Sequence, residues 1–114
     1  MALAFSLFAP NSTDASKISS YLVSNWTPLG PSVPELPGNI SPFISSIELE
    51  AHFAAGYPER ALQLIHTLWG WYIHHPNGTE STVPEGYLVN GTWGYRGDRG
   101  YRYDPAYVSH AHGW

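Results

Sequence analysis

The strongest constraint on the fold is a pair of helices joined by almost no connecting chain. Ser41 stands at a cap position and Pro42 at the first helical position, and the first helix is predicted to end at Ala55. Gly56 follows, and Pro58 begins the second helix. Proline suits the first turn of a helix because its missing N–H has no partner there, whereas glycine ends helices because it adopts left-handed backbone easily. The sequence therefore predicts an αα-hairpin with a very tight turn.

Apolar residues in the second helix recur at spacings of three and four. They are Ala61, Leu62, Ile65, Leu68, Trp69, Tyr72 and Ile73. This spacing is typical of an amphipathic helix with one face in a core. The first helix carries apolar residues on more than one face, which predicts burial on most sides. We expect the tryptophans on and beside these helices to serve the core.

The flanking chain adds one further helix and two loops. A helix is predicted over 13–25, capped by Ser12 or Thr13, and residues 2–8 resemble the last turns of another. The stretch 27–39 is dense in proline and glycine, so an extended loop without paired strands is expected. From residue 77 to 105 no periodicity is present, and the many aromatic residues there favour an ordered loop.

Composition excludes several classes of partner. The net charge is -4 with only five Lys and Arg, so no basic stripe is present for nucleic acid and no polybasic patch for a membrane surface. No apolar run has the length of a transmembrane helix. The charged fraction of 12% is about half the usual value, which indicates faces that pack against neighbours.

The asparagines point to the secretory route. Each of them opens an Asn-x-Ser/Thr sequon, at Asn11, Asn25, Asn39, Asn77 and Asn90. A secreted glycoprotein is therefore expected. The first ten residues lack the basic start of a signal peptide and are typical of the end of a helix, so we expect a chain truncated at its N-terminus.

Glu85 is the candidate for catalysis. It lies between Pro84, which stiffens the approach, and Gly86, which permits a sharp exit, so this frame would aim a single carboxylate. Glycoside hydrolysis uses one carboxylate to activate water and a protonated carboxyl to assist the leaving oxygen. Glu85 could be the first of these, although spacing alone favours an ordinary exposed loop glutamate.

Aromatic and histidine residues nearby are candidates for binding a sugar. Rings cover the apolar faces of a pyranose, and Tyr87, Trp93 and Tyr95 are the candidates outside the helices. His110 and His112 have the alternate spacing of metal ligands on a strand, but no third ligand is evident, so we expect no metal. Hydrogen bonds to sugar hydroxyls or to Glu85 are the favoured role, and packing at a helix start is the simpler one. Asp98 and Asp104 lie among the arginines at 96, 99 and 102, and we interpret them as partners in ion pairs that pin the loop.

Three motifs together resemble a known family. They are Asn39-Ile-Ser-Pro-Phe-Ile-Ser-Ser46, Thr82-Val-Pro-Glu-Gly-Tyr87 and Ser109-His-Ala-His-Gly-Trp114. In order and spacing they look like the C-terminal half of the six-hairpin glycosidase domain of glycoside hydrolase family 78, the α-L-rhamnosidases. The resemblance implies an all-α fold, with residues 1–114 forming a fragment of an (α/α)6 barrel with a long aromatic loop.

The resemblance also implies roles for individual residues. Glu85 matches the general base of an inverting hydrolysis of terminal α-L-rhamnosides, and His110 matches a histidine of the substrate pocket. Trp93, Tyr87 and His112 are the further expected substrate-binding residues. The general acid of the family lies upstream of this segment, so the chain is expected to be inactive alone. No cofactor or metal is implied, and the expected partners are a glycoside or oligosaccharide and the remainder of the barrel.

Two alternatives remain open at this stage. The chain could be a stand-alone carbohydrate-binding or interaction module that uses its aromatic loop and needs no catalytic pair. It could also belong to a different glycosidase or a lyase on the same barrel, because a fold does not fix its chemistry.

Overall fold

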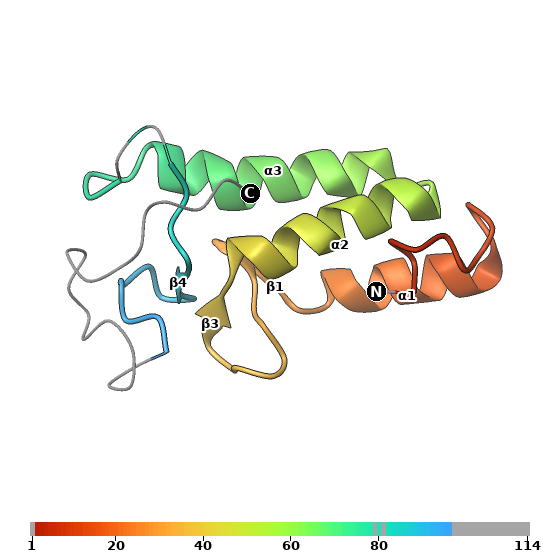
Figure 1. Ribbon diagram of the computed structural model, residues 1–114, viewed down its shortest axis with the longest axis horizontal. Helices are drawn as coiled ribbons and strands as arrows, with labels where there is room; N and C mark the ends of the chain where they lie inside the picture. The colour runs from red at the N-terminus through yellow and green to blue at the C-terminus, as the bar shows by residue number, and fades with distance from the viewer. Residues whose placement is uncertain (1, 79, 81, 97–114) are drawn as a thin grey trace.

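A computed structural model describes residues 2–78, 80 and 82–96 of the chain. Within them, three helices are accompanied by four short strands (Figure 1). In chain order the elements are α1 (Thr13–Val23), β1 (Trp26–Thr27), β2 (Gly30–Pro31), β3 (Asn39–Ile40), α2 (Pro42–Ala55), α3 (Pro58–Ile73) and β4 (Tyr87–Leu88). Helices α2 and α3 pack against each other as a hairpin, and α1 packs against α2.

The predicted all-α class, a fragment of an (α/α)6 barrel, is wrong for the described chain. Two antiparallel sheets are present: β1 pairs with β2, and β3 pairs with β4. The segment 27–39, expected to lack paired strands, contributes to both sheets. Each strand has only two residues, which is too short to show the alternation by which strands are recognised in a sequence. The fold combines three helices with two small sheets.

The predicted αα-hairpin is confirmed. Gly56 ends α2 in the left-handed region at φ 87°, and its N–H donates to carbonyls of the last helical turn. Pro58 starts α3 two residues later. Ser41 occupies the cap position of α2, but its side chain makes no capping hydrogen bond within the described chain. Pro42 and Gly56 therefore fix the ends of this helix.

The upstream helix is also confirmed, with shorter bounds than predicted. Ser12 is its cap, and the Oγ of Ser12 accepts a hydrogen bond of 3.2 Å from the N–H of Ala15. Asp14 stands in the first turn, where the helix dipole favours an anion. Residues 2–6 form turns and not the end of a helix.

Two apolar clusters hold these elements together. One joins the N-terminal turns, α1 and α2 through Leu3, Ala15, Ala51 and Ala55. The other joins α3 to the second sheet through Ile40, Leu64, Leu68 and Tyr87, with Trp26, Trp69 and Trp71 packed against it. The tryptophans of the helices serve the core, as predicted. The second cluster fixes β4, which carries the chain out of the Glu85 segment.

Several apolar residues predicted to be buried are exposed in the described chain. They are Phe43, Ile44 and Phe53 on α2 and Leu62, Ile65 and Ile73 on α3. Within the described chain, α1 and the two short sheets leave these side chains of the α2–α3 hairpin exposed. None of the described helices combines the length and the apolar character needed to cross a membrane.

Candidate functional site

Glu85 stands between two buried residues at the entry to β4. Pro84 and Gly86 are buried, and Tyr87 then pairs with Ile40 of β3. The Glu85 side chain keeps 29% of its surface exposed. The backbone on both sides is thus fixed by the core, while the carboxylate meets solvent.

Gly86 is required by lack of space and not by a left-handed backbone. A Cβ at this position would lie 2.4 Å from ring carbons of Tyr95 and 2.6 Å from the carbonyl oxygen of Ile40. Real Cβ atoms do not approach neighbours so closely. The Tyr95 ring therefore packs directly on the backbone next to Glu85, and Tyr95 is in this way part of the frame that positions the carboxylate.

Arg96 is the one basic side chain that the described chain brings near Glu85. Its Nη1 lies 3.9 Å from Glu85 Oε1, and its own side chain is 59% exposed. Its backbone N–H donates to Asn39 Oδ1 at 2.8 Å, which ties this loop to β3. An exposed ion pair of this kind contributes roughly 0–1 kcal/mol, so it restricts the Glu85 side chain without covering it. The sequence placed Arg96 with the loop aspartates, and the pairing with Glu85 was missed.

Tyr87, a predicted sugar-binding residue, lies in the core. It is fully buried, its hydroxyl donates to Leu29 O at 2.9 Å, and its ring centroid lies 4.4 Å from that of Trp71. Burial raises the pKa of the phenol well above its usual value near 10. Tyr87 thus connects β4 to the turn between β1 and β2.

We expect Tyr87→Phe to lower stability by about 0.5–1.5 kcal/mol near neutral pH, because the Leu29 carbonyl loses its donor. Above pH ~10 the unfolded tyrosine ionises while the buried one stays protonated, so wild-type stability falls by up to about 1.4 kcal/mol per pH unit. Tyr87→Phe has no phenol at this position, so this loss of stability is absent, and the difference in free energy of unfolding between wild type and variant becomes smaller as the pH rises. Urea unfolding from pH 8 to 11 measures this difference. Tyr21→Phe, at a position 70% exposed, is the control, and parallel curves for wild type and Tyr87→Phe would refute the assignment.

Trp93, a second predicted substrate-binding ring, is also buried. Its ring lies edge-on to Tyr72 at 5.8 Å and to His75 at 5.1 Å between centroids. Burial lowers the pKa of His75. These contacts attach the loop to the end of α3. His110 and His112, the remaining predicted substrate-binding residues, lie outside the described residues.

A second polar cluster, not predicted from the sequence, centres on Glu48. Its Oε1 accepts a hydrogen bond of 2.6 Å from Trp26 Nε1 and lies 3.3 Å from His52 Nε2. His52 is fully buried, and its Nδ1 lies 2.9 Å from Ser19 Oγ, which accepts a hydrogen bond from Arg60. With a proton on Nε2, His52 donates to Glu48, and its Nδ1 accepts from the Ser19 hydroxyl, so each of these polar groups has a partner. The spacing of Glu48 and His52, one helical turn apart, was the signal available in the sequence.

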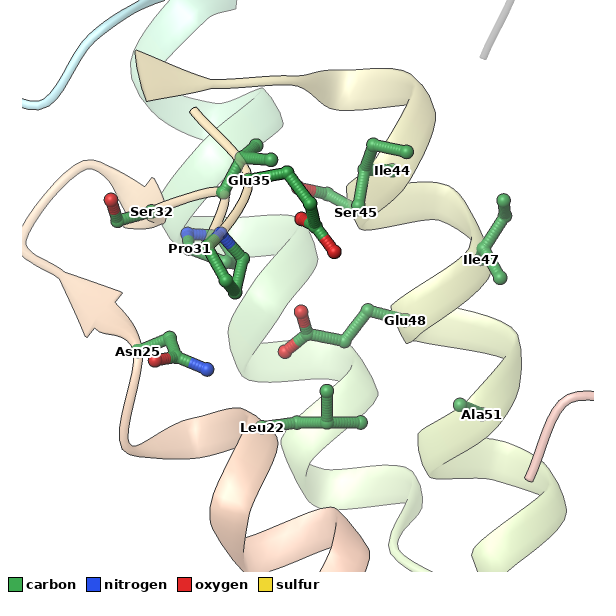
Figure 2. A pocket seen from close by; sticks show the side chains of 12 residues that line it. Leu22, Asn25, Pro31, Ser32, Glu35, Ile44, Ser45, Ile47, Glu48 and Ala51 are labelled. Atoms are coloured by element: carbon green, nitrogen blue, oxygen red, sulfur yellow. The ribbon is translucent and has the colours of Figure 1, made fainter. Parts of the chain in front are cut away.

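Glu48 also lines a cavity of about 500 Å³ between the end of α1, the chain that follows β2, and α2 (Figure 2). Glu85 is not among its lining residues. Within the described residues, no group of three or more His, Cys, Asp or Glu is arranged to hold a metal ion. The Glu85 segment and the cavity are therefore two separate candidate sites.

Comparison with known proteins does not assign a family. No family model matches the sequence, and no curated protein matches it. The functional argument therefore depends on the geometry of the residues and on the motifs described above.

Proposed function

We propose that this chain is a segment of a glycoside hydrolase that acts on terminal α-L-rhamnosides with inversion, and that Glu85 is its general base. The motif resemblance supports the substrate. The observation that carries the proposal is the Glu85 frame, in which buried Pro84 and Gly86 hold a carboxylate that stays partly exposed. A general base needs this combination, because it must reach a water molecule and be held in one place.

The reaction transfers one proton to Glu85. A water molecule bound to the carboxylate attacks the anomeric carbon on the face opposite the leaving oxygen, and its proton passes to Glu85 as the new C–O bond forms. The bond to the aglycone breaks, and a second carboxyl group, about 6.5–9.5 Å from the first, protonates the leaving oxygen. In this proposal, the second carboxyl comes from the part of the enzyme upstream of Ala9.

The other residues take supporting roles in the proposal. Tyr95 packs on Gly86, and Tyr87 fixes β4, so both hold the backbone beside the general base. His110 and His112 stay predicted contacts to sugar hydroxyls. Four of the five sequons support a secreted glycoprotein. Asn39 is the exception among them, because it is buried and its side chain is bonded to Pro37 O and to the Arg96 N–H.

The stereochemistry of the product tests the proposal. The complete protein that contains this segment is recovered from the medium of a eukaryotic host and mixed with an aryl α-L-rhamnoside, and proton NMR follows the first sugar released. We expect β-L-rhamnose to appear first and to mutarotate later. The 114-residue chain alone is the control, with no release above the buffer rate. Initial α-L-rhamnose, or hydrolysis of other glycosides but not of this one, would contradict the proposal.

A further inference from the structure

We propose that the cavity between α1, α2 and the chain after β2 binds a primary ammonium group carried on a short aliphatic chain. The site is separate from Glu85, so this inference does not rest on the proposed glycosidase function. At about 500 Å³ the cavity has the size of a small-molecule site.

The first observation is the charge of the cavity. Glu48 and Glu35 enter it from opposite sides, Glu48 from α2 and Glu35 from the chain after β2 (Figure 2). Lysine, arginine and histidine are absent from the described residues that line it. Two carboxylates without a lining cation favour a cationic ligand and disfavour an anionic one.

The Glu48 carboxylate is also held in place. Glu48 is 8% exposed, and the hydrogen bond from Trp26 and the contact with His52 both involve Oε1. Figure 2 shows the carboxylate directed into the cavity. A carboxylate fixed before the ligand arrives loses less side-chain entropy on binding, which is the advantage of a preorganised site.

The second, independent observation is Ser45. Its side chain is 1% exposed, and among the described residues its hydroxyl has no hydrogen-bond partner. A buried hydroxyl without a partner is costly, and native structures contain few of them. Ser45 lies one turn before Glu48 on α2, lines the same cavity, and has its oxygen on the cavity side in Figure 2. The hydroxyl is therefore placed to accept an N–H from the group that also meets Glu48.

The residues that line the cavity indicate which kind of cation it can bind. The walls are aliphatic, formed by Leu22, Pro31, Val33, Pro34, Ile44, Ile47 and Ala51. No aromatic ring lines the cavity in the described part of the chain, so it lacks the surface that covers a pyranose and the cage that holds a quaternary ammonium. A primary ammonium supplies N–H donors for the carboxylates and Ser45, and an alkyl chain fits the walls.

Titration of the 114-residue chain tests the proposal. The chain is made in bacteria, so that Asn25 at the cavity carries no glycan, and n-pentylamine is added at pH 7 while ¹⁵N–¹H NMR records the amides. We expect saturable shifts at Leu22, Ser45 and Ala51. 1-Pentanol should bind about threefold or more weakly, since charge-assisted hydrogen bonds are the stronger ones, and pentanoate should not compete. Equal binding of the alcohol and the amine, or shifts confined to other residues, overturns the proposal.

Two variants sharpen this test. Ser45→Ala should weaken pentylamine binding by about three- to tenfold, because one hydrogen bond is lost. Ser46→Ala is the matched control, since the Ser46 hydroxyl donates to Phe43 O and Ser46 does not line the cavity. Glu35→Gln removes an exposed charge without disturbing the buried cluster and should also weaken binding. Unchanged affinity in both Ser45→Ala and Glu35→Gln refutes the site.

A primary ammonium group on an alkyl chain can come from a free alkylamine or from the side chain of a lysine. A capped Gly-Lys-Gly peptide distinguishes them. If the peptide binds more tightly than pentylamine and shifts the same amides, the source is a lysine of a polypeptide. If pentylamine binds more tightly, the source is a small amine. Both results support a primary ammonium site. If neither the peptide nor pentylamine binds, the proposal is contradicted.

Discussion

Replacing Glu85 with glutamine in the complete protein is expected, under the proposed glycosidase function, to lower kcat for an aryl α-L-rhamnoside by about 10²–10⁴-fold, the usual contribution of a general base. Glutamine keeps the shape of the side chain and its hydrogen-bonding capacity, but it does not accept a proton from water. KM should change little, because the substrate contacts are unchanged. Steady-state kinetics on the purified variant and wild type measure both constants.

Glu80→Gln is the matched control for this prediction. Glu80 is exposed and lies five residues before Glu85, so the same change of charge is made in the same segment. We expect its kcat to stay within about twofold of wild type, since surface substitutions away from a site have small effects. If Glu85→Gln and Glu80→Gln gave the same rate, Glu85 would be an ordinary loop residue and the assignment would be wrong.

The second large effect is expected from Gly86→Ala. The new methyl group meets the Tyr95 ring at 2.4 Å and the Ile40 carbonyl at 2.6 Å. Because the carbonyl belongs to β3, the strand pair must open or the Glu85 segment must move. Overpacking of this kind costs about 1–3 kcal/mol, and urea unfolding of the 114-residue chain measures the loss. In the complete protein, kcat for the rhamnoside should fall as well, because the displaced backbone carries the proposed general base.

The same substitution elsewhere has the opposite expected sign. Gly70 is within α3, and a Cβ there meets nothing closer than the carbonyl oxygen of Ile65 at 3.9 Å. Gly70→Ala should therefore raise stability by about 0.5–1 kcal/mol through helix propensity. Equal stability of the Gly70→Ala and Gly86→Ala variants would show that the Glu85 segment is free to move, which contradicts a rigid frame.

The helices could be predicted because residues at or next to their ends determine where they begin and end. Pro42, Gly56 and Pro58 set the ends of the hairpin, and Ser12 caps α1 as expected. The sheets could not be predicted in this way. The pairing of Asn39 with Leu88 joins residues far apart in the sequence, and two-residue strands show no period. The error in fold class follows from these short pairings.

The candidate site was predicted in part. The sequence predicted that Pro84 and Gly86 frame Glu85, and the structure shows both neighbours buried, whereas the catalytic role of Glu85 stays a prediction. The buried position of Tyr87 could not be predicted from composition, because a tyrosine in an aromatic loop can bind a sugar or pack in the core. The hydrogen bond from its hydroxyl to Leu29 O shows that it belongs to the core. The approach of Arg96 to Glu85 and the cavity beside Glu48 depend on tertiary contacts between distant segments.

The most direct test of a general base at Glu85 is chemical rescue of Glu85→Gln with azide. Azide needs no deprotonation, so it can attack the anomeric carbon where an unactivated water molecule cannot. We expect azide to restore release of the aryl group from the α-L-rhamnoside and to give β-L-rhamnosyl azide, with no such effect on Glu80→Gln. A rate that stays low at every azide concentration, or a product of α configuration, would show that Glu85 does not act on the water.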